Sequence, residues 1–532
     1  MALTATVFGE SRFLTTIVLV GISGIVTVLA YRKLKAKGRL PLPPGPPGLP
    51  IVGNIFDIPE EDFWWKYKEW SDQYGSDVIY LSVLGREIVV LNSLAACKEL
   101  LEKRSAIYSS RPRMPMMNEL IGFDWNIGFI PYDDAWKGKV DFVSGRKMFS
   151  KAFSPNKILQ HRPALLKAVR NLLLQLLDDP ENFREHIRLL SGSFILDIAY
   201  GLKVTSKDDI YITLAERGMA GQAAAGTTSS YLVDFIPGLQ YFPSWLPGMR
   251  FKRYASEIRK DALAMAREPL IFVETALRMG NARPCIATEA LEELGEGDEN
   301  YRAKKKIIHD VLGSVYSGGS DTTVSSITTF FLAMAQNPDI QARAQAIADE
   351  ALAGQDRLPD FTEYKKLPYI DALVREILRW RPVGPVGVPR IASQDDVYES
   401  YRIPKGATVV PNLYAIAHDP LIYGANPHLF DPARFLNADQ TEIRDDAPTG
   451  YDVFGFGRRV CPGSQSAVET IWAVVVSVLS VFHIGEGRGE NLGKYTSAML
   501  IHPYPFEVHI TPRSEEAEML VRNGVLEDHD FS

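Results

Sequence analysis

One ten-residue segment, Phe454 to Gly463, constrains the fold of this chain more than any other feature. It reads Phe-Gly-Phe-Gly-Arg-Arg-Val-Cys-Pro-Gly, and the spacing Phe-x-x-Gly-x-Arg-x-Cys-x-Gly fixes five positions. At average residue usage, the chance of one such match in a chain of this length is on the order of 10⁻⁴. A lone cysteine is usually a buried, unreactive residue. The spacing around Cys461 argues strongly against that interpretation here.

The residues around Cys461 suit a thiolate bound to iron, because such a ligand needs a tight loop that excludes water. Gly457 and Gly463 allow backbone to approach the sulfur, and amide N–H groups can then hydrogen-bond to it. Phe454 can shield the sulfur, and Arg459 would meet a negatively charged haem propionate. We therefore predict that Cys461 is the metal ligand and that the other four residues bind the cofactor.

A second segment, Ile307 to Met334, is apolar and helical in pattern but contains two adjacent glycines. Gly318 and Gly319 stand within Ser-Gly-Gly-Ser-Asp-Thr-Thr. A glycine inside a helix costs about 0.5 to 1 kcal/mol relative to alanine, so a specific requirement should keep each of them there. Taken alone, the segment favours a close crossing of two helices, which small residues permit.

Together, the two segments resemble the cytochrome P-450 superfamily of haem-thiolate monooxygenases. The resemblance implies a mainly α-helical fold with small β-sheets, and a haem b whose iron is held by Cys461. It also favours an oxygen-binding groove at the glycine pair. Thr322 would then donate a hydrogen bond to bound oxygen and Asp321 would feed protons inward, as the catalytic residues.

The remaining pattern agrees with a mainly α fold. The stretch from Val78 to Leu91, with a turn at Gly85, predicts strands, and a second strand-like region runs from about Pro382 to Val410. A segment rich in Gly and Pro, Pro427 to Gly463, precedes an apolar helix predicted from Ser466 to Phe482.

Three charged residues are predicted to form a structural network. Glu376 and Arg379 lie three positions apart and can pair on one helix face, although any long helical protein offers such pairs. In the family this pair is completed by the arginine of a Pro-x-Arg-Phe element, which Arg434 supplies here. A buried glutamate must be paired, and two arginines would do so on the cysteine side of the haem.

The chain departs from the family pattern before Arg146. In the family a helix carrying Trp-basic-x-x-Arg contacts the haem propionates, but here Trp136 and Lys137 precede Arg146 by six residues too many. The resemblance implies that Trp136 contacts haem. We interpret residues 138–145 as an extra loop or, by preference, as an artefact of gene prediction such as an unremoved intron. A real insertion could weaken haem retention and inactivate the protein. Arg390, where related sequences commonly carry His, can still donate to a propionate.

The N-terminus predicts a membrane anchor. Phe13 to Tyr31 is an uncharged run of 19 residues, long enough as a helix to cross a bilayer. Basic residues within 32–39 should hold the following loop on the cytoplasmic side. A cleaved signal peptide is less favoured, because no small-residue cleavage site follows. We expect a lumenal segment at 1–12, a transmembrane helix at 13–31, a basic, proline-rich hinge at 32–50 and a cytosolic catalytic domain at 51–532, in the endoplasmic reticulum membrane.

Composition excludes other classes of function. The net charge is −7, so there is no basic excess for nucleic acid. Three cysteines cannot form a disulfide framework in so long a chain. No nicotinamide, flavin or phosphate-binding glycine motif is present, so electrons must come from a partner. The resemblance implies the membrane-bound NADPH–cytochrome P-450 reductase, docked on a basic patch near the cysteine loop.

A loop between helices, Tyr231 to Phe251, is unusually aromatic for a free surface. It carries Phe235, Tyr241, Phe242 and Trp245. Packing onto the core and contact with a membrane near a substrate entrance are equally compatible with this composition.

The expected reaction is insertion of one oxygen atom into a lipophilic small molecule. The stretch Ile195 to Gly201 and the aromatic loop resemble fungal microsomal members of secondary metabolism, with terpenoids as the first substrate class and indole or other aromatic compounds as the second. Two alternatives stay open: a haem-thiolate isomerase or dehydratase, which needs no reductase, and a haem-binding protein inactivated by the insertion.

Overall fold

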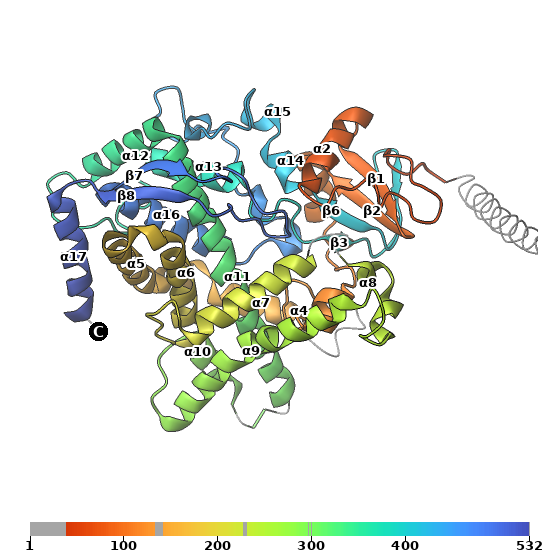
Figure 1. Cartoon of the computed structure of the whole chain (residues 1–532), viewed down its shortest axis with the longest axis horizontal. Coiled ribbons are helices and arrows are strands. Elements are labelled where there is room, and N and C mark those ends of the chain that lie inside the picture. The colour runs from red at the N-terminus through yellow and green to blue at the C-terminus, as the bar shows by residue number, and fades with distance from the viewer. Residues whose placement is uncertain (1–38, 133–141, 227–230, 296, 299, 531–532) are drawn as a thin grey trace, which may run out of the picture.

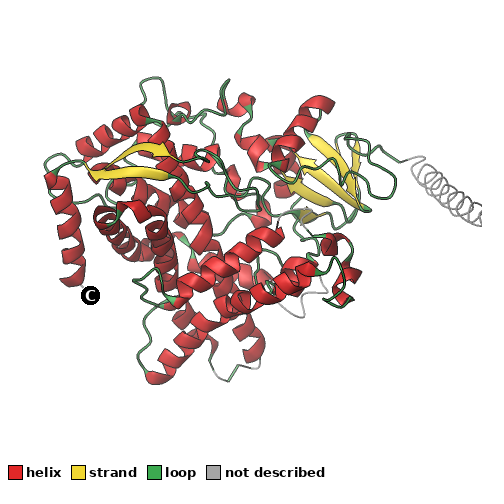
Figure 2. Cartoon of the chain, viewed as in Figure 1, coloured by secondary structure: helices red, strands yellow, loops and turns green. Residues whose placement is uncertain are grey.

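In a computed structural model, the chain is described at residues 39–132, 142–226, 231–295, 297–298 and 300–530. The described residues form a mainly helical body with three small sheets (Figure 2). This confirms the fold class predicted from the sequence. The predicted transmembrane helix at 13–31 lies outside the described residues.

The largest sheet has four strands in the order β1-β2-β6-β3. Its strands are β1 (Val78–Val83), β2 (Arg86–Leu91), β6 (Thr408–Pro411) and β3 (Arg390–Ile391). β1 and β2 form an antiparallel hairpin whose turn includes Gly85 at φ 84°. β2 pairs in parallel with β6, and β3 pairs antiparallel with β6. Both strand regions predicted from the sequence are therefore confirmed.

Two further sheets and the helices make up the rest of the described chain. The two-stranded sheets pair β4 (Asp396–Tyr398) with β5 (Tyr401–Ile403), and β7 (Phe482–Arg488) with β8 (Glu507–Pro512). The helices are α2 (Phe63–Tyr74), α3 (Leu94–Cys97), α4 (Phe142–Ala152), α5 (Pro155–Asp178), α6 (Phe183–Tyr200), α7 (Ile210–Gly226), α8 (Leu232–Phe235), α9 (Arg250–Met279), α10 (Ile286–Leu294), α11 (Tyr301–Gln336), α12 (Pro338–Ala351), α13 (Pro368–Trp380), α14 (Leu413–Ala417), α15 (Pro420–Tyr423), α16 (Ser464–Val481) and α17 (Glu515–Asp530). The short 3-10 or π turns are η1 (Lys98–Lys103), η2 (Pro115–Ile121), η3 (Pro180–Asn182), η4 (Pro237–Tyr241), η5 (Pro432–Phe435), η6 (Asp452–Phe454) and η7 (Gly457–Arg459).

Helix α11 passes through the helical part of the molecule and packs against α4, α6, α9 and α16 (Figure 1). It spans 36 residues, and most of its second half is buried on every side, as the paired Phe330 and Phe331 illustrate. A helix that is apolar all round is stable only inside a large core. This position makes α11 a fixed support for the polar residues in its middle.

Helix α16 follows the cysteine loop directly and confirms the apolar helix predicted there. Among the described residues it is the one helix long and apolar enough to cross a membrane, but 72% of it is buried within the body. Its neighbours are α5, α12 and α13, and Trp472 on α16 is fully buried. It is therefore a core helix that anchors one end of the cysteine loop.

Candidate active site

The thiol of Cys461 lies deep in the body, between η7 and the start of α16. Burial raises its pKa, while a hydrogen bond from the Gly463 amide and the positive charge of Arg146 lower it, and the net shift of the pKa is upward. The Cys461 side chain is nevertheless exposed. A thiol that is surrounded by protein and still accessible can be reached by a bound metal.

The backbone around Cys461 folds back on itself. The Cys461 N–H donates to the Phe454 carbonyl oxygen at 2.9 Å. Gly457 has a φ of 55°, and a Cβ there would overlap the Leu101 carbonyl oxygen of η1. Gly457 is therefore required by packing against η1, and its predicted role beside the sulfur stays a prediction. The predicted hydrogen bond to the sulfur comes from Gly463.

Four arginines gather beside the cysteine loop. Burial, then the charges of Arg390 and Arg146, lower the pKa of Arg459 to about 9. Burial lowers the pKa of Arg390 to about 10. Arg111 is buried, and burial together with the other three arginines holds its pKa well below the ordinary value. Guanidinium groups crowded in this way call for an anion.

These arginines are held in place by backbone carbonyls. Arg459 donates to Ser109, Ile127 and Ile130, and Arg390 donates to Leu101 and Phe456, at 2.7 to 3.2 Å. Carbonyl oxygens orient a guanidinium without cancelling its charge. Among the described residues, no carboxylate contributes to the pKa shifts of Arg111 or Arg390. The chemistry of this set fits the two propionates of a haem.

The two adjacent glycines of α11 serve different purposes. A Cβ at Gly319 would overlap Ile195 of α6, whereas a Cβ at Gly318 would meet nothing within 4 Å. Gly319 thus permits the close helix crossing, and Gly318 borders open space. The close helix crossing is confirmed at Gly319, and the oxygen-binding groove at Gly318 stays a prediction. The Thr322 hydroxyl donates to the Gly318 carbonyl at 2.7 Å, so Thr322 lies on the same open face.

The cysteine loop and the middle of α11 meet at Ile127. Arg459 donates to the Ile127 carbonyl at 3.0 Å, and the Ile127 N–H donates to the Ser314 hydroxyl of α11 at 2.9 Å. One turn further along α11 is Gly318. The open space at Gly318 and the exposed thiol of Cys461 therefore lie close to one backbone segment.

The charged network predicted from the sequence is confirmed. Arg379 Nε donates to Glu376 Oε2 at 2.6 Å, and Arg434 Nε donates to Glu376 Oε1 at 3.2 Å. The side chains of Glu376 and Arg379 are fully buried. Arg379 also donates to the carbonyls of Ala417 and Pro427. The network ties α13 to the segment that leads into the cysteine loop.

In the interrupted Trp-basic-x-x-Arg motif, the structure describes Arg146 and does not describe Trp136. Arg146 lies on α4 close enough to Cys461 and Arg459 to act on the pKa of each. The arginine expected at the end of the interrupted motif therefore reaches the site. Trp136 lies outside the described residues, as do residues 138–141.

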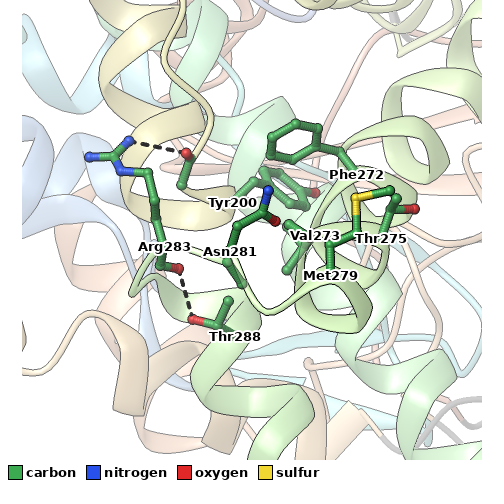
Figure 3. A pocket seen from close by; sticks show the side chains of 11 residues that line it. Tyr200, Phe272, Val273, Thr275, Met279, Asn281, Arg283 and Thr288 are labelled. Carbon is green, nitrogen blue, oxygen red and sulfur yellow. Dashed lines mark hydrogen bonds between the residues drawn. The ribbon is translucent and has the colours of Figure 1, made fainter.

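The two cavities described in the body do not coincide with this site. One of about 170 Å³ lies between the ends of α6 and α9, where Tyr200, Phe272 and Met279 line it (Figure 3). A second of about 280 Å³ is bounded by α4, α5, α6 and α10. Neither cavity is lined by Cys461 or Thr322. The active site is therefore identified by the chemical character of its residues and not by the volume of a cavity.

Two site residues could not be recognised from the sequence. Arg111 follows an ordinary Ser-Ser pair, and only folding brings it to Arg390 and Arg459. His502, in the C-terminal tail, contacts Asp321 at 3.1 Å between Nε2 and Oδ2. These two positions are separated by 181 residues. The described residues contain no cluster of three or more His, Cys, Asp or Glu that could hold a metal ion.

An exposed cysteine, a cluster of arginines oriented by backbone carbonyls and an open glycine position on a long core helix together fit a haem-thiolate enzyme. A model of the Cytochrome P450 family matches residues 43–510. The chain therefore belongs to the cytochrome P450 family. It is an oxidoreductase of the monooxygenase type, and its cofactor is a haem whose iron takes the Cys461 thiolate as axial ligand.

Several curated relatives are fungal. Cytochrome P450 monooxygenase eriA of Hericium erinaceus is 40% identical over 513 residues, with 95% of each chain covered. Cytochrome P450 monooxygenase 98 of Postia placenta is 38% identical, covering 94% of this chain and 96% of the relative. Tryptamine 4-monooxygenase of Psilocybe cyanescens is 37% identical, covering 91% and 96% respectively.

Proposed function

We propose that this protein hydroxylates or otherwise oxidises a lipophilic small molecule in fungal secondary metabolism, using dioxygen and electrons that originate from NADPH. The observation that carries the proposal is that Ile127 hydrogen-bonds both Arg459 of the cysteine loop and Ser314 of α11, one turn before the open position at Gly318. When bound, the haem supplies the oxygen chemistry. The chain itself supplies orientation, exclusion of water and protons.

Thr322 and Asp321 are proposed as the catalytic residues. The Thr322 hydroxyl already makes a hydrogen bond to Gly318 and can reorient toward the open space beside it. The Asp321 carboxylate is partly exposed, and a carboxylate with access to solvent can exchange protons. The two groups are proposed to hold protons in turn on the way to the reacting oxygen.

The haem propionates are proposed to bind the arginine cluster. Arg390 and Arg459 suit propionate binding best, because their guanidinium groups are buried and oriented by carbonyl oxygens. Trp136 is proposed to join them. Phe454 and the Gly463 amide would shield and hydrogen-bond the thiolate, which keeps water from the sulfur.

The substrate is proposed to be lipophilic because an apolar cluster lies beside the same part of α11. It contains Met117, Phe123, Trp125 and Met499, all of them buried. Methionine side chains adapt to irregular apolar shapes. We infer terpenoid scaffolds as the first substrate class. An indole or other aromatic substrate is the second, and it is favoured by the relative named for tryptamine.

The protein is proposed to act on the endoplasmic reticulum membrane, with residues 13–31 as anchor and NADPH–cytochrome P450 reductase as partner. Exposed apolar side chains support a membrane-facing surface: Ile51, Phe56, Tyr241 and Trp245. The two segments that carry these side chains border the same hydrophobic cluster, because Ile55 from the first segment and Phe235 from the second both pack against it. The exposed Arg458 beside the cysteine loop suits a reductase of opposite charge.

Reductase-supported turnover tests this function. The membrane-expressed protein, with the reductase and NADPH, should consume NADPH and oxidise members of a terpenoid and indole panel, with one oxygen atom from labelled dioxygen in the product. Product formed without reductase would indicate an isomerase or dehydratase. A haem-containing protein that never consumes NADPH with any substrate would indicate an inactive one.

A further inference from the structure

His502 makes the one polar contact that the described structure gives to the side chain of Asp321. The His502 Nε2 atom lies 3.1 Å from Asp321 Oδ2, and about a quarter of each side chain is exposed. A carboxylate on a helix surface can adopt several rotamers unless a partner selects one. His502 is such a partner, and it comes from a distant part of the chain.

His502 is itself held rigidly. The backbone N–H of His502 donates to the Thr496 hydroxyl at 3.0 Å, and the backbone carbonyl of His502 accepts from the Thr496 N–H at 2.9 Å. An isolated β-bridge joins Tyr495 to Pro503 on either side. These contacts close a hairpin from Lys494 to Tyr504, so the imidazole is presented from a fixed backbone.

The hairpin is fastened to α11 at three points, each one helical turn from the next, one of which is the contact between the Thr329 and Tyr495 hydroxyls at 3.0 Å. The Ser325 hydroxyl donates to the Ile501 carbonyl at 2.6 Å, and Asp321 contacts the neighbouring His502. Residues 321 and 325 lie on the same face of a helix. Removing the imidazole would leave the contacts of Ser325 and Thr329 intact, so the hairpin should stay in place while the carboxylate is released.

The tip of the same hairpin reaches the apolar cluster proposed to receive the substrate. Met499 is buried with Phe123 and Trp125, and it packs so closely on Gly226 of α7 that a Cβ there would overlap its sulfur. A single rigid hairpin thus contacts both the apolar cluster and the proposed proton-carrying acid.

We propose that His502 is a positioning residue that fixes the Asp321 carboxylate beside Thr322, so that protons reach the reacting oxygen only while the 494–504 hairpin is seated on the substrate cluster. The proposal rests on the proposed monooxygenase function. It assigns to the C-terminal hairpin a part in the efficiency of the reaction as well as in substrate contact. Loss of the imidazole should therefore divert reducing equivalents from product to hydrogen peroxide.

The test compares His502→Ala, His502→Gln and a matched surface control, His509→Ala, in the full-length protein with its reductase. The Gln amide can replace the hydrogen bond from Nε2 and cannot carry a proton. We expect His502→Ala to release roughly threefold more peroxide per NADPH, His502→Gln to restore the native ratio, and His509→Ala to match the native protein. Equal ratios in all four proteins, or equal losses in both His502 variants, would overturn the positioning role.

Thermal unfolding gives a readout that is independent of turnover. In a cycle of Asp321→Ala and His502→Ala, the midpoint shift of the double variant should be smaller than the sum of the single shifts, because the two side chains share one contact. Additive shifts would overturn the contact. A native protein that binds no haem or consumes no NADPH would overturn the proposed function and this inference with it, whereas an active native protein with unaffected variants overturns the inference alone.

Discussion

At the scale of single residues, the site is built from groups that would be unstable without specific partners. Glu376 is fully buried between Arg379 and Arg434. Arg390 and Arg459 are buried, and their pKa values are depressed to about 10 and about 9 by burial. The first set is neutralised within the protein, whereas the second is oriented by backbone carbonyls and is proposed to bind the haem propionates. Arginine therefore stabilises the fold in the Glu376 network and is proposed to bind the cofactor beside the cysteine loop.

Replacing Glu376 with Gln should unfold the protein or prevent haem incorporation. Removing this charge leaves Arg379 and Arg434 without their shared carboxylate, at a cost of about 3 to 5 kcal/mol. Thermal unfolding and the ratio of haem to protein would measure the effect. A Glu376→Gln protein with native stability and native haem content would contradict the structural role of the network.

Residue patterns predicted the cysteine loop, the Glu376 network and the two glycines, because each depends on local spacing. The packing of Gly457 against the distant η1 was not predicted. Arg111 and His502 were missed for the same reason: each becomes part of the site only through contacts that span more than a hundred residues. Local patterns hold no information about such contacts.

At the scale of elements, the region around α8 and η2 consists of short segments that single polar contacts hold together. Asp234 of α8 accepts a hydrogen bond from the Met116 N–H of η2 at 2.9 Å. Burial raises the pKa of Asp234 to about 6, against lowering contributions from that hydrogen bond and Arg86. The aromatic loop that begins at α8 is thus attached to η2 through a carboxylate whose pKa is about 6.

Asp234→Asn should stabilise the protein at neutral pH and not in acid. Because the folded-state pKa lies above the ordinary value of 3.8, the folded protein binds the proton more tightly than the unfolded chain. This stabilisation is complete below about pH 4 and is lost as the pH rises to about 6. The neutral Asn avoids that loss, so we expect a gain of about 1 to 2 kcal/mol at pH 7.5. Unfolding midpoints measured from pH 4 to 8 would test this, and a difference independent of pH would contradict it.

A second prediction at this scale concerns helix α4 and the interrupted motif before Arg146. We predict that deleting six residues from 138–145 will increase the haem-to-protein ratio, because Trp136 would then regain its family spacing from Arg146. Sequencing the cDNA is the direct control. A transcript that retains the six codons, with haem content unchanged or reduced by the deletion, would establish the insertion as a working part of the protein.

At the scale of the whole molecule, exposed apolar side chains are concentrated near one end. The four-stranded sheet and α8 lie on the same side of the body in Figure 1, and the described chain enters there at residue 39. Tyr241, Trp245 and Phe56 are each more than three quarters exposed. Aromatic side chains at such a surface are typical of contact with a membrane interface.

We predict that protein lacking residues 1–38 will still bind lipid vesicles through this surface. A combined Phe56→Ser and Trp245→Ser variant should bind severalfold more weakly, because each aromatic ring contributes burial at the interface. Vesicle co-sedimentation measures the difference, and Phe272→Ser, an exposed position on α9, provides the control. Equal binding by the double variant and its parent would place the membrane contact elsewhere.

The carbon-monoxide difference spectrum of the dithionite-reduced, membrane-expressed protein, compared with Cys461→Ala, tests the thiolate ligation most directly. Ligation by Cys461 predicts a strongly red-shifted Soret band in the native protein and its loss in the variant. A red-shifted band that persists in Cys461→Ala would contradict the assignment of this cysteine as the axial ligand.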